Sequence, residues 1–477
     1  MTITTQQSKA IESCRPAISL VAGAGCGKTE TLARRVRRLI DDGCPPEEIA
    51  VFTFTNNAAM ELKERIGPLA AKCLVGTFHA VAYRLMCTNP VIIDEPSVID
   101  LLNKIRPSSS HSARKLMHLI GEVRQGRKVN DAGIHVLASE FESLLKITGS
   151  IDYLGLLLWL REHAKAMEIR NVIVDEAQDN ETLQWDIVHE FMNIGASGFA
   201  VGDTCQSIYE WRGAKPKDFL DFGEHMHLSH SFRMPLDVCE YANKIAIHVD
   251  PQSMPMTTEN QNNGLSFSSG TWSRVVQDLL DEEMYSPKDI AVLCQTNDRV
   301  RAVAYDLRAH DIPVQDLIDT EPLLLQVLRG MAYPAWSSYK KHELVAPEFL
   351  FGKPEDIPGW LAREGINTIR DAVSCIKFNS PVHNDDIEWM LFNFGELSLK
   401  DGVNEAAISY RELRGERMGV LVTTTHQAKG LEFPVVVVSF NEINLSYMNK
   451  RSLRLLYVAA TRAKERCVIL DAVRYGY

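Results

Sequence analysis

The stretch AISLVAGAGCGKTET, residues 17–31, decides how the rest of the chain is interpreted. A short apolar run is followed by a glycine-rich loop, and TLARRVRRLI then continues as a predicted helix. Gly25 and Gly27 let backbone N–H groups approach an anion, and the helix N-terminus adds a positive dipole end. Lys28 can reach the β and γ phosphates of a nucleotide, and the Thr29 hydroxyl can ligate Mg²⁺. The stretch predicts a phosphate-binding loop; a glycine-rich turn with a chance Lys-Thr pair is the disfavoured alternative.

Length and composition bound the class of protein. The chain has 477 residues, 45% hydrophobic and 24% charged, which is ordinary globular composition. Two or more domains are expected, because single cores stop growing near ~250–300 residues. A net charge of −11 argues against polyanion binding over the whole surface but allows a local basic groove. The 10 cysteines form no C-x-x-C pair, which disfavours zinc and fits a reduced compartment. We find no signal layout and no membrane-spanning apolar run, and expect a cytoplasmic protein.

Apolar or β-branched runs alternate with helical-looking segments in two groups. The runs are AISLVAG (17–23), IAVFTFT (49–55), NVIVDEA (171–177) and GFAVGD (198–203), then DIAVLCQT (289–296), GVLVTTTH (419–426), FPVVVVSF (433–440) and RCVILDA (466–472). Alternation of this kind predicts parallel sheets with right-handed crossovers. The fold class is therefore predicted to be α/β, with two parallel-sheet cores.

The remaining segments divide the chain further. PQSMPMTTENQNNG is polar, contains Pro and Gly and has no periodicity, so it reads as a linker. The segment after residue 84 has helical periodicity and no strong strand, and a later segment is mixed. We predict a first core at 1–84 and 166–250 with a helical insertion at 85–165, a linker at 251–264, and a second core at 265–324 and 411–477 with a small insertion at 325–410.

Two adjacent acids follow an apolar run in NVIVDEAQD, residues 171–179. A core strand has no structural use for Asp175 and Glu176 side by side. They stand at the carboxyl end of a predicted strand, where α/β sheets place ligands. Asp175 suits Mg²⁺ binding, and Glu176 suits orientation of a water molecule. Acids clustering at a helix N-terminus are the alternative; beside the phosphate loop, the catalytic interpretation is favoured.

Several further segments resemble, in the same order, the motifs of UvrD/Rep-like superfamily 1 DNA helicases. They are VFTFTNNAAMELKERI (51–66), GTFHA (76–80), DEAQD (175–179), VGDTCQSIYEWRGA (201–214), TTTHQAKGLEF (423–433) and LLYVAATRAKER (455–466). The resemblance implies two RecA-like cores with ATP between them and single-stranded DNA across both. It also implies 3′→5′ translocation driven by ATP hydrolysis, with Mg²⁺ as the second cofactor.

The resemblance assigns roles around the nucleotide. Gln7 would read adenine, Gln206 would sense the γ-phosphate, Glu432 would lie near the ribose, and Arg233 and Arg462 would close on the phosphates. The predicted catalytic residues are Lys28, Asp175, Glu176, Gln206, Arg233 and Arg462, and the predicted metal ligands are Thr29 and Asp175. The predicted nucleotide-binding residues are Gln7, Ala22, Gly23, Ala24, Gly25, Cys26, Gly27, Lys28, Thr29, Glu30, Phe232, Arg233, Glu432 and Arg462. The arginines of the helix at 31–40 are expected to form a solvated face.

A second set of residues matches positions that hold DNA in the family. Phe54, Tyr209 and Trp211 match aromatics on which bases stack, and stacking tolerates any sequence. Thr77, His79 and His426 match positions near the DNA backbone. Burial in the core is the alternative for Phe54, and an ordinary satisfied histidine is the alternative for His79 and His426. Single-stranded and tailed duplex DNA are the implied partners.

The chain also departs from the family pattern. Phe232 stands where a tyrosine is common, and Glu30 stands where an arginine often follows the loop. The second insertion is short, which is similar to phage-type helicases and to the helicase-like subunit of Gabija systems. An alternative function is therefore a nucleotide-gated DNA-binding or sensor subunit that works beside a nuclease or a repair protein. The pathway, DNA repair or anti-phage defence, stays open.

Cys26 lies inside the predicted phosphate loop. A neighbouring Lys28 and a helix N-terminus both lower the pKa of a thiol, so one hypothesis is a reactive thiolate that makes the site sensitive to alkylation. The alternative is an inert small residue that fills space in the loop.

Overall fold

The computed structural model describes residues 3–105 except 87 and 89, 112–316 except 252, 419–440, and 445–470 except 447. Between 317 and 418 it describes only 328, 365, 367–375, 391 and 396–398, so most of the insertion predicted at 325–410 lies outside the described residues. The chain divides into two compact units, Met1–His310 with Thr423–Tyr477, and Asp311–Val422. Nearly all of the elements below belong to the first unit, which is described by itself.

The first sheet has six parallel strands in the order β3-β2-β6-β7-β1-β8. The strands are β1 (Ala17–Ala22), β2 (Ile49–Thr53), β3 (Leu74–Thr77), β6 (Asn171–Val174), β7 (Ser197–Gly202) and β8 (Glu224–Leu228). The predicted parallel α/β core is confirmed. The sequence pattern did not indicate β3 and β8, which are less apolar and lie at the two edges of the sheet.

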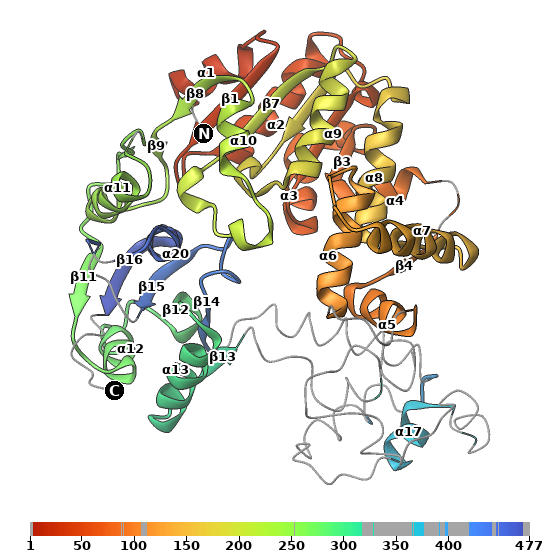
Figure 1. The fold of residues 1–477 in the computed structure, drawn as a ribbon. Helices are drawn as coiled ribbons and strands as arrows, with labels where there is room; N and C mark the ends of the chain where they lie inside the picture. The colour runs from red at the N-terminus through yellow and green to blue at the C-terminus, as the bar shows by residue number, and fades with distance from the viewer. Residues whose placement is uncertain are drawn as a thin grey trace. The chain divides into compact units, whose positions relative to one another are not determined.

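Burial on both faces explains why the central strands read as continuous apolar runs. In β2 every residue is buried, and Ala50 and Phe52 point to one face. Phe52 stacks on Phe78 with ring centroids 4.1 Å apart. Helices α4 (Phe78–Leu85), α8 (Tyr153–His163) and α9 (Thr182–Asn193) contribute buried side chains to this same cluster. Helices α1 (Thr5–Glu12), α2 (Lys28–Asp41), α3 (Asn56–Ile66) and α10 (Pro216–Asp221) complete this core (Figure 1).

The second sheet has six strands in the order β11-β16-β15-β12-β14-β13. They are β11 (Leu265–Ser268), β12 (Ile290–Cys294), β13 (Val314–Asp316), β14 (Val420–Thr424), β15 (Phe433–Ser439) and β16 (Ala463–Leu470). The pairings β11–β16, β16–β15, β15–β12 and β14–β13 are parallel. This confirms the second predicted α/β core. Its helices are α12 (Trp272–Asp281), α13 (Asn297–Ala309) and α20 (Lys450–Ala460). Helix α11 (Leu236–Val249), which falls within the range predicted for the first core, packs on α20.

The segment predicted as a linker is held by specific contacts. Asn243 on α11 accepts from the Met256 backbone N–H and donates to the Met256 carbonyl, both at 2.8 Å. Strand β10 (Thr257–Thr258) pairs in parallel with β9 (His230–Ser231), and the Met256 side chain is buried. A polar, aperiodic stretch is thus tied down by backbone pairing, which depends on its spatial neighbours.

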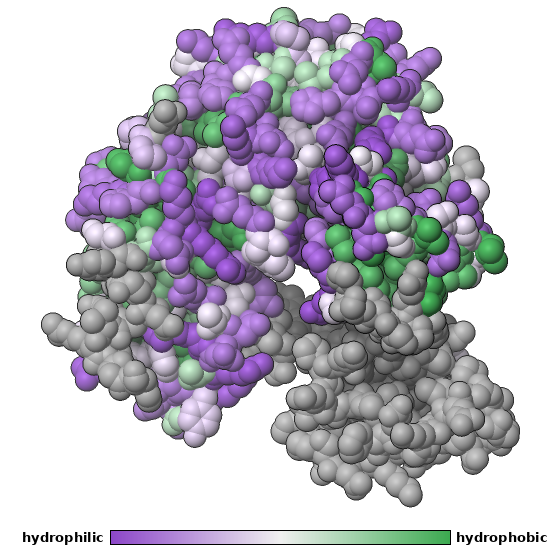
Figure 2. All heavy atoms as spheres, in the orientation of Figure 1, coloured by the Kyte–Doolittle hydropathy of each residue, from purple (hydrophilic) through white to green (hydrophobic). Residues whose placement is uncertain are grey.

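The helical insertion has a small core of its own. Helices α5 (Glu95–Ile105), α6 (Ala113–Arg124) and α7 (Ala132–Ile147) bury nine apolar side chains against one another. Strands β4 (Val91–Ile93) and β5 (Ser150–Asp152), which the sequence did not suggest, pair in parallel at its base. Exposed apolar side chains gather on this insertion (Figure 2), including Val91, Val136 and Ile147. Among the helices described, none is both long and apolar enough to cross a membrane.

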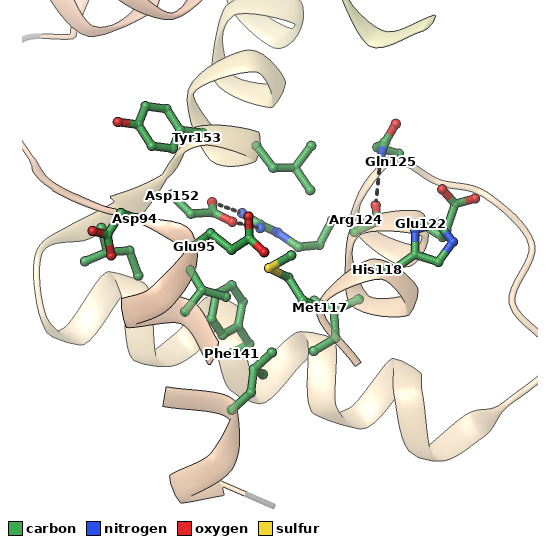
Figure 3. A pocket seen from close by; sticks show the side chains of 16 residues that line it. Asp94, Glu95, Met117, His118, Glu122, Arg124, Gln125, Phe141, Asp152 and Tyr153 are labelled. Carbon is green, nitrogen blue, oxygen red and sulfur yellow. Dashed lines mark hydrogen bonds and ion pairs between the residues drawn. The ribbon is translucent and has the colours of Figure 1, made fainter. Parts of the chain in front are cut away.

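A buried arginine ties α6 to the end of β5. Arg124 donates to both carboxylate oxygens of Asp152, at 2.6 and 2.9 Å, and to Glu142 at 2.9 Å. Its guanidinium lies over the Phe141 ring, and only 5% of its side chain is exposed. Both residues of this pair line a cavity of about 340 Å³. Figure 3 shows them there with Met117 and Phe141, which also line it. Because Asp152 also accepts from the Gly155 N–H, the same carboxylate begins α8.

We expect Arg124→Met to destabilise the insertion by about 3 kcal/mol, because it strands the buried Asp152 carboxylate. Amides of α6 and α7 should then exchange with deuterium roughly a hundredfold faster. Arg127→Met is the matched control, since Arg127 pairs with Glu122 and 42% of its side chain is exposed. Equal exchange in the two variants would show that Arg124 does not hold the insertion together.

Candidate functional site

Most of the predicted site residues of the first core lie where parallel strands end. The phosphate loop follows β1, Asp175 follows β6, Phe54 comes just after β2, and Thr77 ends β3. The carboxyl ends of parallel strands share one edge of a sheet, so residues far apart in sequence meet there. Asp203, which follows β7 between β6 and β1, joins them.

Two glycines of the phosphate loop cannot be replaced by residues with a side chain, because of their backbone conformation and the closeness of neighbouring atoms. Gly25 and Gly27 have φ of 72° and 75°, which side chains rarely adopt. A Cβ on Gly25 would lie 2.7 Å from Ser231 Oγ, and one on Gly27 would lie 2.7 Å from Gln7 Nε2. The Phe232 N–H also donates to the Gly25 carbonyl at 3.0 Å. The predicted nucleotide-binding residues Gly25 and Phe232 are therefore in direct contact.

Gln7 and Phe232 lie on the same side of Gly27. Gln7 Oε1 accepts from the Thr4 N–H at 2.9 Å, and Gln7 Nε2 donates to Thr31 Oγ1 at 3.2 Å. The Phe232 ring is 43% exposed and lies within 4 Å of a Cβ built on Gly27. An amide and an exposed aromatic side chain thus lie beside the phosphate loop, and the predicted contact of both residues with a nucleotide stays a prediction.

The expectation of a solvated arginine face is wrong for Arg35. This side chain is 4% exposed and lies over the Phe199 ring at 4.6 Å. Its Nη1 donates to the carbonyls of Ala10, Ile11 and Ser13 at 2.9–3.1 Å. Arg35 thereby satisfies the C-terminal carbonyls of α1, the helix that carries Gln7. A helical pattern cannot show this, because the acceptors belong to another element.

Glu30 has a different role from the arginine that is common at this position in the family. Its carboxylate pairs with Arg34 at 2.6 Å and with Arg65 of α3 at 3.2 Å. The Arg34 hydrogen bond, against the opposing effect of burial, holds the pKa of Glu30 below its usual value. Glu30 therefore joins α2 to α3.

The first two acids of DEAQD, Asp175 and Glu176, lie within the electrostatic influence of a lysine. Asp175 is 4% exposed, and Glu176 has a φ of 49°, an unusual backbone state for a residue with a side chain. Burial and the charge of Glu176 raise the pKa of Asp175. Burial opposes ionisation of Glu176 too, but Lys28 and Lys429 lower its pKa. Because the charge of Lys28 acts on both carboxylates, the three groups form one electrostatic cluster.

Gln178 connects this cluster to the next strand. It donates to Glu176 Oε2 at 2.5 Å, and its Oε1 accepts from the Asp203 N–H at 2.9 Å. Sequence reasoning did not single out Gln178. Its place inside DEAQD, between two acids, was the available signal.

The predicted γ-phosphate sensor and one predicted arginine are in contact across the two cores. Arg462 Nη2 donates to Gln206 Oε1 at 3.0 Å, and Gln206 Nε2 donates to Asp203 at 2.8 Å. Arg462 is 3% exposed, and burial together with Arg233 lowers its pKa to about 10, so it remains charged at neutral pH. The second core thus delivers a buried cation to the carboxylate cluster, since the charge of Arg462 also acts on Glu176.

Arg233 and Glu432 form an ion pair that also joins the two cores. Arg233 Nη1 donates to the Thr461 carbonyl at 2.9 Å, directly before Arg462. The two predicted arginines therefore lie together, one contributed by each core. In this arrangement Glu432 contacts Arg233, and its predicted role near a ribose stays a prediction.

Two cross-core residues of this site were not predicted. Lys429 forms a buried ion pair with Asp179 and donates to the Gln206 carbonyl at 2.8 Å. The hydroxyl of Tyr457 donates to Asp203 at 3.2 Å and accepts from the Ala24 N–H of the phosphate loop at 3.4 Å. Both lie within motifs already recognised, QAKGLEF and LLYVAATRA, but their partners are more than 200 residues away.

The aromatic residues predicted to hold DNA lie near one another. The rings of Phe54 and Tyr209 stack with centroids 5.1 Å apart, and the Tyr209 hydroxyl donates to the His426 carbonyl at 3.2 Å. Phe54 is only partly buried, so full burial in the core does not apply. Trp211 is 63% exposed, with the Arg212 guanidinium 5.4 Å from its ring.

The other two predicted contacts of the first core lie at the start of α4. Thr77 caps this helix by accepting from the Ala80 N–H at 3.2 Å. His79 makes an edge-on contact with Tyr153 of α8, and burial lowers its pKa. Both have a structural role, so any contact with DNA would be an additional one.

The residues present fit a magnesium nucleotide. The glycine cradle leaves no room for side chains, and Lys28, Arg233 and Arg462 supply positive charge. Among the described residues, no group of three or more His, Cys, Asp or Glu side chains could hold a metal by itself. That is the usual arrangement for Mg²⁺, which takes few protein carboxylates and completes its shell with water and phosphate oxygens.

The hypothesis of a reactive Cys26 thiolate is not supported. The side chain is 1% exposed, and burial raises its pKa to about 12 despite the opposing charge of Lys28. Loss of solvation of a thiolate outweighs the helix and lysine effects on which the hypothesis depended.

We expect iodoacetamide to modify Cys26 in the folded protein more than about a hundredfold more slowly than Cys14, which is exposed. Peptide mass spectrometry against reaction time measures both rates in one sample. Comparable rates at the two cysteines would contradict the burial of Cys26.

Comparison with known proteins places these motifs in a family. The family model for the UvrD/REP helicase N-terminal domain matches residues 3–143 and 134–227. The model for the UvrD-like helicase C-terminal domain matches residues 419–470. Together the matched ranges cover the first parallel-sheet core, strands β14, β15 and β16 of the second core, and more than half of the chain.

Individual relatives are more distant. The chain is 25% identical to ATP-dependent DNA helicase PcrA of Leuconostoc citreum over 65% of this chain and 49% of that protein. It is 28% identical to DNA helicase II of Escherichia coli over 50% of this chain and 39% of that protein. Gabija protein GajB of Bacillus cereus is 24% identical over 96% of this chain and 94% of its own length.

The chain thus spans about half the length, or less, of the first two of these relatives. It nevertheless carries the ordered motif set across both cores, with the predicted nucleotide residues of each core in contact with those of the other. The chain belongs to the UvrD-like helicases.

Proposed function

We propose that this chain is an ATP-dependent DNA helicase that moves 3′→5′ on single-stranded DNA and couples ATP hydrolysis to strand separation. The observation that carries the proposal is the cross-core contact of Arg462 with Gln206 beside Lys28, Asp175 and Glu176. The curated relatives named as ATP-dependent DNA helicase and DNA helicase II support the same activity.

Each group has a chemical part in this proposal. Lys28 and the phosphate loop would bind the phosphates, while Thr29 and Asp175 would hold Mg²⁺, which supplies charge neutralisation at the phosphoryl group. Glu176 is kept ionised by Lys28 and Lys429, so it can accept a proton from an attacking water. Arg462 and Arg233 would stabilise the charge that develops on the phosphates.

In this proposal, ATP hydrolysis is coupled to movement of the cores through an arginine that reaches from one core to the other. Arg462 belongs to the second core and reaches Gln206 of the first, so its position depends on how the cores pack. Gln206 lies three residues before Tyr209 and five before Trp211, which are proposed to stack on bases. Hydrolysis would alter the charge that holds the cores together and so change their grip on DNA.

A second candidate function is a nucleotide-gated DNA-binding or sensor subunit within a larger complex. The observation that favours it is the match to Gabija protein GajB over 94% of that protein and 96% of this chain. In this case ATP hydrolysis would be stimulated by DNA, but the chain alone would release little strand.

Duplexes with a 3′ or a 5′ single-stranded tail test the proposal under ATP and Mg²⁺. We expect strand release from the 3′-tailed substrate alone. Glu176→Gln should bind ATP and DNA but lower turnover by about 10²–10⁴-fold, because the proton acceptor is lost. Glu47→Gln, at an exposed position of the same core, is the control.

Strand release from the 5′-tailed duplex would contradict the proposed 3′→5′ polarity. Near-normal ATP hydrolysis by Glu176→Gln would show that Glu176 is not the proton acceptor. DNA-stimulated ATP turnover without strand release from either tail would favour the second candidate.

We expect Trp211→Ala to weaken binding of single-stranded DNA by about 1–3 kcal/mol, or roughly 5- to 150-fold, because a stacking platform is lost. Fluorescence anisotropy with an oligothymidylate at fixed salt measures this change. Tyr305→Ala is the matched control, since Tyr305 is 77% exposed on α13, away from the motifs. If both variants bind as the wild type does, Trp211 is not part of the DNA site.

A further inference from the structure

Helix α20 and the two residues that follow it contact the loop 203–214 at three places, of which two have been described. The Tyr457 hydroxyl donates to Asp203, and Arg462 donates to Gln206. The third contact is an ion pair, with Arg454 Nη1 2.6 Å from Glu210 Oε2. This third pair lies on the side of the loop that carries the exposed aromatics, so the proposed nucleotide site does not explain it.

Glu210 has an unusual position for an acid. It stands between Tyr209, which stacks on Phe54, and Trp211, which is 63% exposed. A carboxylate between two proposed base-stacking side chains supplies no attraction for a polyanion. Its presence is therefore better explained by what it holds in the protein than by contact with DNA.

The partner arginine is not a mobile surface group. Only 12% of the Arg454 side chain is exposed, against 49% for Glu210. In the sequence of α20, Arg454 stands between the buried residues Leu453 and Leu455. Surface ion pairs contribute little because two free side chains must be ordered. Here the helix already orders one of them, so the pair can transmit a displacement of the loop.

The geometry points to a positioning role: we propose that the Glu210–Arg454 pair couples DNA binding on the loop 203–214 to the placement of Arg462 for ATP hydrolysis. This inference rests on the proposed function. When bases stack on Trp211 and Tyr209, the loop takes a defined position, and Glu210 carries Arg454 with it. Arg462 lies two residues beyond the end of α20 but is tied to its last turn, since its Nε donates to the Val458 carbonyl at 3.1 Å and its N–H donates to the Ala459 carbonyl at 3.2 Å. A displacement of α20 at Arg454 would therefore move Arg462 as well.

The test compares DNA stimulation of ATP turnover in Glu210→Gln, Arg454→Gln and the charge exchange Glu210→Arg with Arg454→Glu. Each single variant should lose roughly tenfold of the stimulation by oligothymidylate, a typical coupling between sites. Turnover without DNA and the Kd for DNA should stay within about twofold, and the charge exchange should restore most of the stimulation. Glu282→Gln is the matched control, because it removes the Arg466–Glu282 pair of 2.5 Å elsewhere in the second core.

Wild-type stimulation in Glu210→Gln would overturn the inference and leave the proposed function intact. A Kd that changes as much as the stimulation would also overturn it, because the pair would then contact DNA. If circular dichroism shows that the charge exchange is misfolded, the double variant Glu210→Gln, Arg454→Gln replaces it. If the two residues act as one pair, stimulation of ATP turnover by DNA should be no lower in this double variant than in either single variant. Additive losses of stimulation would contradict the proposal. Absence of any DNA stimulation in the wild type would instead reject the proposed function.

Discussion

The interface between the two cores depends on the hydrogen-bond partners of one buried cation, the guanidinium of Arg462. Arg462 is 3% exposed and yet charged at neutral pH. A buried charge is costly unless hydrogen bonds and opposite charge surround it. Its Nε donates to the Val458 carbonyl within the second core, and its Nη2 donates to Gln206 of the first. Since neither core alone supplies all partners, the position of one core on the other is specified by polar groups and not only by apolar burial.

The same requirement organises the rest of the site. Lys429 is buried against Asp179, and Arg233 pairs with Glu432, so each core presents cations to acids of the other. Breaking one partner of such a pair leaves an uncompensated charge, which makes these contacts sensitive to what lies between the cores. An anionic nucleotide brought to Lys28 would redistribute this charge. A site held by polar pairs can therefore respond to a ligand, whereas an apolar interface would respond less.

Because the strands of the first sheet are parallel, a small number of residues is enough to form the site. Strand ends place Asp175, Asp203 and the phosphate loop along one edge, and Gln178 bridges neighbouring strand ends through the Asp203 N–H. Glu176 adopts a φ of 49° directly after Asp175, so the chain leaves the extended conformation at this residue. The backbone state is thus part of the site, because two adjacent carboxylates in an extended strand would point to opposite faces of the sheet.

The sequence by itself determined the fold class, the phosphate loop, the acids after β6 and the order of the motifs. These features are local: apolar runs, glycine spacing and strand ends are visible within about ten residues. Only the tertiary structure decided that Lys429 meets Asp179, that Tyr457 reaches both Asp203 and Ala24, and that Arg454 pairs with Glu210. It also decided that Arg35 is buried under α1 and that the pKa of Cys26 is raised. The physical reason is the same in each case, because partners and loss of water come from segments distant in sequence, and a local pattern carries no information about them.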